Sequence, residues 1–537
     1  MLRRPCTRRL TLRARVALGG VIAAVTCLIA AAAPALAAPD WTKAVRSQPG
    51  FRIPKVFVTA RDAQAAPGFI FLTPRTMYPG RTGPTILDTD GHVVWFHRQS
   101  HRVSAQNLRP QVYRGKPVLS WSVSPPLLRE GEVLTRATTP QNTYDVIANS
   151  SYRIIKRVRA IGRGVITNGH EFVITPRNTA LLLGSRALPR RLRAYGGPAS
   201  GRIVDDLVQE IDLRTGKLLF NWSAARRIPL SESVVKFPKT GYWDPYHLNS
   251  ISVDSDGNLL VSARHTSTVY KISRRSGQII WKLGGKHSSF KMGRGASFYY
   301  QHDAVRQADG TITLFDNGAT DDDRSHERES QAKRLRLSTK TRTATLVRRF
   351  RHPSGNGLST SQGNTSILPN GDVFVGWGIS PWFSEYAADG RLLFGAHFQS
   401  VWHHSYRAFK APWSGRPLTK PAIYARITSG HVAAYVSWNG ATDVAQWRLL
   451  GGDTKTSLAE LGRSAWADFE TKLAFDGTPG FVQVQGLDAS GNVIGQSAVI
   501  APKRQGAAAR MQPAPRQLVS VARRSCSAAR SAPLSSP

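Results

Sequence analysis

The sequence predicts an all-β protein, a six-bladed β-propeller followed by a small immunoglobulin- or fibronectin-like β-sandwich. Short apolar or alternating runs are separated by Asp-Gly, Asn-Gly and Ser-Gly turns, a pattern typical of strands and hairpins. Long helical periodicity is hard to find. The runs also repeat along the chain at a length that fits one propeller blade.

The repeat is clearest at His247–Gly285, where four apolar runs and two turns form a four-stranded meander. Each unit alone would expose both faces of its sheet, and radial packing of the units buries them. A series of β-sandwiches is the alternative, but sandwiches would not require two hairpins to recur at the same positions in every unit. The other units are Phe69–Arg98, Asn107–Ala160, His170–Ala224, His302–Phe350 and Gln362–Phe398.

The pattern changes after Trp413. Pro421–Ile500 has shorter alternating runs, and Asn439-Gly440 is a hairpin signal, which together indicate a sandwich. We therefore expect a signal peptide at 1–37, an N-terminal extension at 38–66, the propeller at 67–416, the sandwich at 417–502 and a disordered basic tail at 503–537.

The first residues predict export. Met1–Arg15 has six Arg and no acid, Val16–Ala33 is apolar, and Ala35-Leu36-Ala37 is a small-x-small cleavage site. Arg8-Arg9 resembles a twin-arginine signal, and an ordinary Arg-rich signal is the alternative. No later run reaches the ~18 apolar residues of a membrane span, so no stable span is expected after signal cleavage.

Composition excludes several classes of site. The three cysteines, Cys6, Cys27 and Cys526, lie in the predicted signal and tail, so the core has no disulfide, thiolate nucleophile or cysteine zinc site. The formal charge of +39, from 73 Lys+Arg against 34 Asp+Glu, first suggests nucleic acid. The basic residues are spread along the chain and no nucleic-acid motif accompanies them, so we expect no nucleic-acid partner.

Polar residues recur at one register of the repeat. In a propeller, the first residues of the innermost strands converge at one end of the central channel. His247 lies two residues before Asn249, on the same strand face, and Arg264 lies at the far end of the next strand. Residues eight positions before a first-hairpin turn residue are Asn107, His170, Asn249 and His302.

Three His, two Asn and one Arg in a basic setting favour an anionic ligand. Zinc is an alternative for three His, but no His-Glu-x-x-His occurs and Arg264 would repel a cation, so no metal is expected. No phosphate loop, nucleophile elbow or dinucleotide fingerprint occurs, so we expect neither a cofactor nor a nucleotide donor. Structural hydrogen bonding is the alternative for each channel His.

These motifs resemble the bacterial arylsulfotransferase family over Phe69–Trp413. The resemblance rests on Asp244-Pro-Tyr-His247-Leu-Asn249-Ser-Ile, Ser262-Ala-Arg264-His265, Gly169-His170-Glu-Phe, Gln301-His302-Asp-Ala and Asp316-Asn317-Gly318. It implies a six-bladed propeller that moves a sulfuryl group from a phenolic sulfate ester to a phenol, through a transiently sulfated His. It further implies His302 as nucleophile, His170, His247 and Arg264 as its helpers, and Asn249 in the sulfate cradle. From the shared register we also expect Asn107 to bind substrate.

Known members of that family have an N-terminal sandwich and a disulfide, and this chain departs from both. A covalent His intermediate predicts ping-pong kinetics with a small-molecule aryl sulfate donor and a phenolic acceptor. Either His170 or His247 supplies the proton to the leaving phenolate. The alternative function is a non-catalytic propeller that binds an anionic or aromatic ligand, and the sequence does not predict the oligomeric state.

Overall fold

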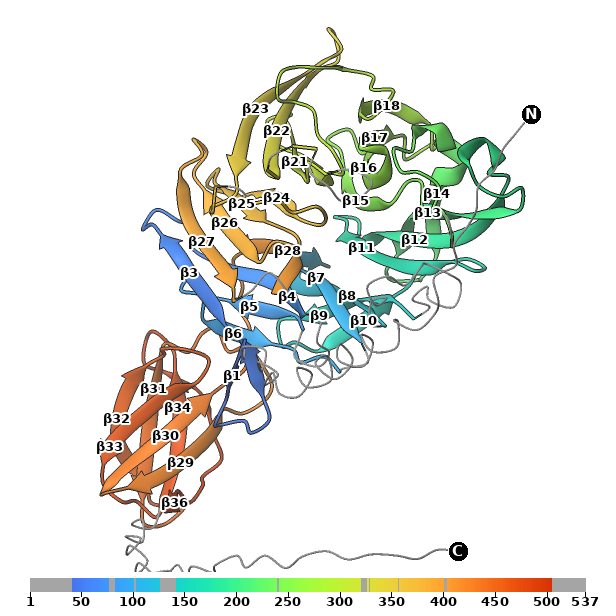
Figure 1. The fold of residues 1–537 in the computed structure, drawn as a ribbon. Coiled ribbons are helices and arrows are strands. Elements are labelled where there is room, and N and C mark those ends of the chain that lie inside the picture. The colour runs from blue at the N-terminus through green and yellow to red at the C-terminus, as the bar shows by residue number, and fades with distance from the viewer. Residues whose placement is uncertain are drawn as a thin grey trace, which may run out of the picture.

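A computed structural model describes residues 41–76, 83–100, 103–125, 142–238, 241–319, 326–327, 329–355, 357–399 and 403–504. These residues are almost entirely β, as the sequence predicts. Between Val56 and Ala411, six sheets of four or five strands surround a common centre (Figure 1). The all-β class and the propeller are thus confirmed. We call each sheet a blade and name it by its innermost strand.

Four blades are continuous in sequence, each an antiparallel meander. Gly at positive φ closes tight turns between strands of these blades, as at Gly257 (φ 79°) and Gly310 (φ 80°). The strands are β7 (Ser104–Tyr113), β8 (Lys116–Ser124), β9 (Tyr144–Asn149) and β10 (Ile154–Val158); β11 (Ile166–Ile174), β12 (Thr179–Arg190), β13 (Gly201–Asp212) and β14 (Leu218–Ser223); β15 (Leu248–Val253), β16 (Leu259–Ala263), β17 (Thr268–Ile272) and β18 (Ile279–Gly284); and β20 (His302–Arg306), β21 (Ile312–Asp316), β22 (Gln331–Ser338) and β23 (Thr343–Arg351), with β19 (Lys291–Met292) parallel to β23.

The last two blades join the two ends of the propeller. The β24 blade has β24 (Asn364–Ile367), β25 (Val373–Gly376), β26 (Trp382–Tyr386) and β27 (Leu392–Phe398), and β3 (Val56–Arg61) from the predicted N-terminal extension adds a fifth, outer strand. The final blade combines β28 (His403–Ala411) with β4 (Phe69–Thr76), β5 (Thr85–Leu87) and β6 (Val93–Phe96). The unit Phe69–Arg98 therefore takes its innermost strand from the other end of the ring.

Apolar side chains fill the spaces between adjacent blades. Leu183 and Val208 of the β11 blade pack with Leu248 and Val261 of the β15 blade, and all four side chains are fully buried. Burying one such side chain stabilises the fold by about 1.5–3 kcal/mol. Short helices occur only between strands in the described part of the chain: η1 (Arg193–Tyr195), α2 (Ala224–Arg227), η2 (Leu230–Glu232) and η3 (Arg264–Thr266).

Two further four-stranded sheets enclose a separate core around Trp447 and Leu449. This unit contacts the closing blade through Asn439, whose side chain accepts from Phe96 N (2.9 Å) and donates to Phe96 O (3.0 Å). One sheet has β29 (Ala422–Thr428), β30 (His431–Ser437), β33 (Thr471–Asp476) and β36 (Lys503–Arg504); the other has β31 (Gln446–Gly452), β32 (Ala459–Ala465), β34 (Phe481–Leu487) and β35 (Val493–Gln496).

The chain ends bear on the remaining sequence predictions. The predicted signal peptide and most of the basic tail lie outside the described residues. The first two tail residues form β36, which pairs with β29. The hairpin of β1 (Thr42–Ala44) and β2 (Arg52–Pro54) precedes β3. In the described ranges, no helix has the length and apolar composition needed to cross a membrane.

Closure of the ring by β4 makes its buried side chains important for stability. Leu72 is fully buried there, so Leu72→Ala should lower the free energy of unfolding of the propeller by about 2–5 kcal/mol. The exposed Leu418 is the matched control, and its substitution by Ala should change stability by less than about 0.5 kcal/mol. Denaturant unfolding measures both, and equal effects would contradict a closed ring.

Candidate active site

Four of the predicted side chains form one cluster at an end of the channel. His170, His247, Arg264 and His302 come from the β11, β15 and β20 blades, and Tyr406 of β28 lies among them. The rings of His170 and His247 are 4.9 Å apart, and that of Tyr406 lies 5.6 Å from His170 and 6.3 Å from His302. We call the end of the channel lined by these five residues the mouth.

His247 is held by a carboxylate. Its Nδ1 lies 2.6 Å from Asp244 Oδ2, three residues earlier, and its backbone N–H also donates to Asp244. His247 has a positive φ of 50°, so the turn before β15 brings the side chain back onto Asp244. Burial alone would raise the pKa of Asp244, but the charge of His247 and its hydrogen bonds outweigh burial and hold that pKa well below its usual range.

Arg264 and His265 begin the short helix η3 beside His247. The backbone N–H of Arg264 donates to His247 O (3.0 Å), which ties this turn to β15. Arg264 Nη1 lies 2.8 Å from His265 Nε2, and its guanidinium lies 4.2 Å above the ring of Tyr300. Burial, together with the charge of His247, lowers the pKa of His265 to about 3, so His265 accepts the Arg264 hydrogen bond as a neutral ring.

His302 is 1% exposed, and both of its ring nitrogens have partners. Nδ1 lies 2.7 Å from Asn317 Oδ1, which makes Nδ1 the protonated nitrogen, and Nε2 accepts a 3.2 Å hydrogen bond from the backbone N–H of Gln362. Burial holds the pKa of His302 well below its ordinary value, and the charge of Arg264 lowers it further. His302 is therefore a neutral imidazole near pH 7.

His170 is also neutral but has a different partner. Its Nδ1 contacts Asn168 Oδ1, and burial, followed by the charge of His247, holds its pKa well below the ordinary value. Among the described residues, no hydrogen bond or ion pair engages Nε2 of either His170 or His247. Both rings therefore have a nitrogen available to a ligand in the mouth.

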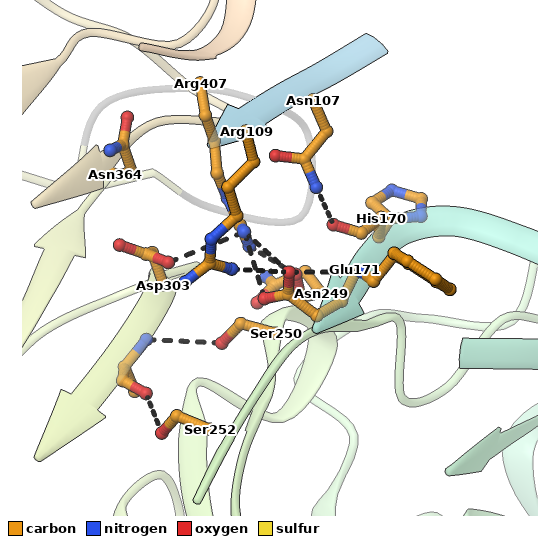
Figure 2. A network of polar contacts seen from close by, with 12 residues as sticks. Asn107, Arg109, His170, Glu171, Asn249, Ser250, Ser252, Asp303, Asn364 and Arg407 are labelled. Carbon is orange, nitrogen blue, oxygen red and sulfur yellow. Dashed lines mark hydrogen bonds and ion pairs between the residues drawn. The ribbon is translucent and has the colours of Figure 1, made fainter. Parts of the chain in front are cut away.

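Asn107 and Asn249, predicted to bind substrate, join neighbouring blades. Asn107 donates to His170 O (3.3 Å), and Asn249 donates to Gln301 O (2.8 Å). Asn364 repeats the arrangement by donating to Ala408 O (2.8 Å). In each case the amide reaches the innermost strand of the next blade or the residue before it, so the shared register reflects blade packing. Figure 2 shows the contact between Asn107 and His170.

An ion network lies inside the channel, next to the mouth residues (Figure 2). Arg407 of β28 is fully buried, and its Nη1 lies 3.0 and 2.9 Å from the two carboxylate oxygens of Glu171 and 3.6 Å from Asp303. Its Nη2 donates to Asn249 O (3.0 Å) on the opposite blade. Arg109 makes a second contact with Glu171 at 3.2 Å. Two cations and two carboxylates thus connect five of the six blades.

The network is joined to the mouth through the backbone. Glu171 follows His170, Asp303 follows His302, and Arg407 follows Tyr406. Burial alone would lower the pKa of Arg407, but the charges of Glu171 and Asp303 outweigh burial and hold it above its ordinary value. Because Glu171, Asp303 and Arg407 each follow a mouth residue along the same strand, pairing these three ions brings the mouth side chains together.

A cluster of His and Asp side chains can also bind a metal ion. Asp244, His247 and His265 place one ligand atom each within 4.8 Å of one another, as do Asp88, Asp90 and His92 at the surface. In the first set, the Asp244 carboxylate is bonded to His247, and Arg264 lies against His265. The guanidinium charge opposes a cation there, so the hydrogen-bonded cluster accounts for the arrangement better.

Several functional candidates escaped sequence reasoning. Tyr406 and Arg407 lie on β28, which the repeat pattern left outside the last unit, so no register pointed to them. Among the aromatic residues close to the site motifs, Tyr299 and Tyr300 line a cavity of about 370 Å³, whereas Tyr246 and Trp377 are fully buried in apolar cores. The motif Asp316-Asn317 was the available signal for the His302 partner.

The fold and the site define a β-propeller protein with a mouth lined by His and Arg. A model of the arylsulfotransferase (ASST) family matches residues 125–399, just over half of the chain. The chain therefore belongs to the arylsulfotransferase family. Membership supports sulfotransferase activity on small-molecule substrates. No curated protein matches the chain.

Solved structures with similar folds are distant. A protein of unknown function from Bacteroides caccae shares 12% identity over 64% of this chain and 99% of that chain, with a TM-score of 0.39. A protein from Lactobacillus plantarum shares 14% identity over 76% and 100%, with a TM-score of 0.31. An inactive virginiamycin B lyase from Staphylococcus aureus shares 10% over 67% and 88%, with a TM-score of 0.28. These similarities carry no argument about function.

Removing the central cation should destabilise the propeller. Arg407→Met leaves Glu171 and Asp303 buried beside an apolar side chain, and we expect a loss of about 3–5 kcal/mol in the free energy of unfolding. Neutralising both carboxylates in the same chain (Glu171→Gln, Asp303→Asn) should restore much of that loss. Arg416→Met, which breaks an exposed pair with Asp443, is the control and should cost about 1 kcal/mol or less. Equal losses would contradict a central network.

Proposed function

We propose that the protein transfers a sulfuryl group from an aryl sulfate ester to a phenol through a sulfated His302, with no nucleotide donor. The observation that carries this proposal is the convergence of His170, His247, Arg264 and His302 at one mouth, where His302 is buried and neutral. Family membership supports the reaction class. The Arg-rich first residues support export as the setting.

His302 acts as the nucleophile through Nε2. The Nδ1–H bond to Asn317 leaves the Nε2 lone pair as the nucleophilic one, and a neutral ring has that lone pair available. In the first step Nε2 attacks sulfur and the bond from sulfur to the aryl oxygen breaks. The Gln362 N–H, which now donates to Nε2, is then released to donate to a sulfuryl oxygen.

His247 serves as the proton donor and acceptor. Its Nδ1 faces the Asp244 carboxylate at 2.6 Å, and that carboxylate stabilises the imidazolium form. The Nε2–H of the imidazolium protonates the departing phenolate in the first step. In the second step Nε2 takes the proton of the acceptor phenol as its oxygen attacks sulfur and the S–N bond breaks. His170, bonded to the neutral Asn168, lacks such a carboxylate and instead donates or accepts a hydrogen bond.

Arg264 stabilises the transferring group. Sulfuryl transfer spreads negative charge over three oxygens, and a fixed guanidinium in a site shielded from water stabilises such charge strongly. The hydrogen bond to His265 and the contact with the Tyr300 ring hold the Arg264 guanidinium in place. Tyr300, over whose ring the Arg264 guanidinium lies, also lines the cavity that contains Tyr299.

The direct test follows 4-nitrophenyl sulfate and phenol. The wild-type protein should release nitrophenol at a rate that rises with phenol concentration, and His302→Ala should abolish that release because Ala places no lone pair at the position of Nε2. His352, which is 4% exposed and packs against Trp377 away from the mouth, is a control matched for burial. Activity retained in His302→Ala, or absent from a folded wild-type protein, would overturn the proposal.

The proton role of His247 predicts a dependence on the leaving group. Asp244→Asn removes the charge that stabilises the imidazolium, so transfer from phenyl sulfate should slow by about 100-fold, in line with general acid catalysis. The loss should be much smaller for 4-nitrophenyl sulfate, whose phenolate leaves more readily without a proton. Rates for a series of substituted phenyl sulfates measure this. Asp88→Asn, which breaks a surface Asp–His pair, is the control. Equal losses for all donors would contradict the assignment.

A further inference from the structure

Arg75 is a buried arginine whose side chain donates to a neutral amide. It lies on β4 opposite His404 of β28, and the residue is 7% exposed. Its Nη1 donates to Gln106 Oε1 at 3.0 Å. In the part of the chain that the structure describes, no acidic side chain forms an ion pair with it. Arg407, on the strand that pairs with β4, has two carboxylates.

Arg75 therefore contributes a buried positive charge that its neutral partner Gln106 does not offset. Burial lowers the pKa of Arg75 to about 10, a value at which the guanidinium is still charged at neutral pH. A buried charge is costly unless it is paired. Gln106 supplies one neutral acceptor for a group with five N–H donors, so an anion brought next to Arg75 would be bound strongly.

Arg75 is linked to the mouth through Gln106. Gln106 accepts from Arg75 and donates through Nε2 to Gly169 O at 2.8 Å, directly before His170. The charge of Arg75 is among those that lower the pKa of His170, after burial and the charge of His247. Arg75 also lowers the pKa of His404, for which burial is the larger cause. The guanidinium thus acts on the residues of the mouth.

Arg75 and Arg264 occupy opposite sides of the ring. The order of the six blades places the β28 blade, which contains Arg75, across the channel from the β15 blade, which contains Arg264. Arg264 lies on the side of His302, where the sulfuryl group reacts. A single sulfate on that side leaves Arg75 uncompensated. The residue also lies outside the segment that matches the family model, so the match assigns it no role.

We propose that Arg75 binds a second anionic group, a carboxylate or sulfonate, on the aromatic substrate. This inference rests on the proposed function, since it places the reacting group between Arg264 and His302. Aryl substrates with an acidic substituent remote from the reacting oxygen are then the preferred class. Arg75 is a binding residue for the nonreacting end of these substrates and takes no part in bond making.

Calorimetric binding of two unreactive ligands tests the proposal. The wild-type protein should bind 4-sulfobenzoate, with two anionic groups, about tenfold more tightly than benzenesulfonate, with one, as expected for a hydrogen-bonded charge pair. Arg75→Gln should abolish that preference and leave benzenesulfonate binding unchanged. Arg98→Gln, at an exposed arginine, should keep the preference. Arg75→Lys keeps the charge and should retain part of the preference. This variant provides the test if Arg75→Gln does not fold.

Two outcomes would overturn the inference: no preference in the wild-type protein, or an equal loss for both ligands in Arg75→Gln. The second would mean that Arg75 binds the single sulfonate. Because neither ligand reacts, the preference can be present in a protein without transferase activity. The proposed function can therefore fail while this inference holds. Conversely, normal transfer to phenol with no preference for the doubly charged ligand would overturn this inference alone.

Discussion

The ion network of Arg407 with Glu171 and Asp303 is the constraint on which the mouth depends. These three side chains are buried at the centre of the ring, where a single unpaired member would be costly. Each is adjacent in sequence to a mouth residue, so satisfying the ions also fixes where His170, His302 and Tyr406 lie. The same cation reaches Asn249 O on the opposite blade, which joins the closing strand to the rest of the ring.

The electrostatics of the mouth divide its histidines into two groups. Burial and neighbouring positive charge keep His170 and His302 neutral, whereas His247 faces the Asp244 carboxylate. Displacement by an imidazole needs one neutral ring as nucleophile and a second group that carries the proton. In the proposed mechanism His302 is the nucleophile and His247, beside the Asp244 carboxylate, carries the proton. The charge of Arg264 lowers the pKa of His302, and in the proposed mechanism the same charge attracts the sulfuryl oxygens.

Local pattern was enough to predict much of this architecture. Turn spacing predicted the all-β propeller, and the shared register singled out His170 and His302, while His247 was predicted from its place two residues before Asn249. The register did not distinguish site residues from residues that join the blades. Asn107 and Asn249 occupy it, and their amides donate to backbone carbonyls of the next blade. Arg75, Tyr406 and Arg407 were missed because β4 and β28 are more than 300 residues apart in sequence. A strand pair with that separation leaves no local periodicity to detect.

Covalent transfer through His302 is the central claim, and rapid mixing of the protein with 4-nitrophenyl sulfate in the absence of acceptor tests it most directly. The account predicts a burst of one nitrophenol per protein molecule, together with a sulfo group on the peptide that contains His302. Addition of phenol should then remove the label. A linear release with no burst and no labelled peptide, in a protein that still transfers sulfate to phenol, would contradict the account.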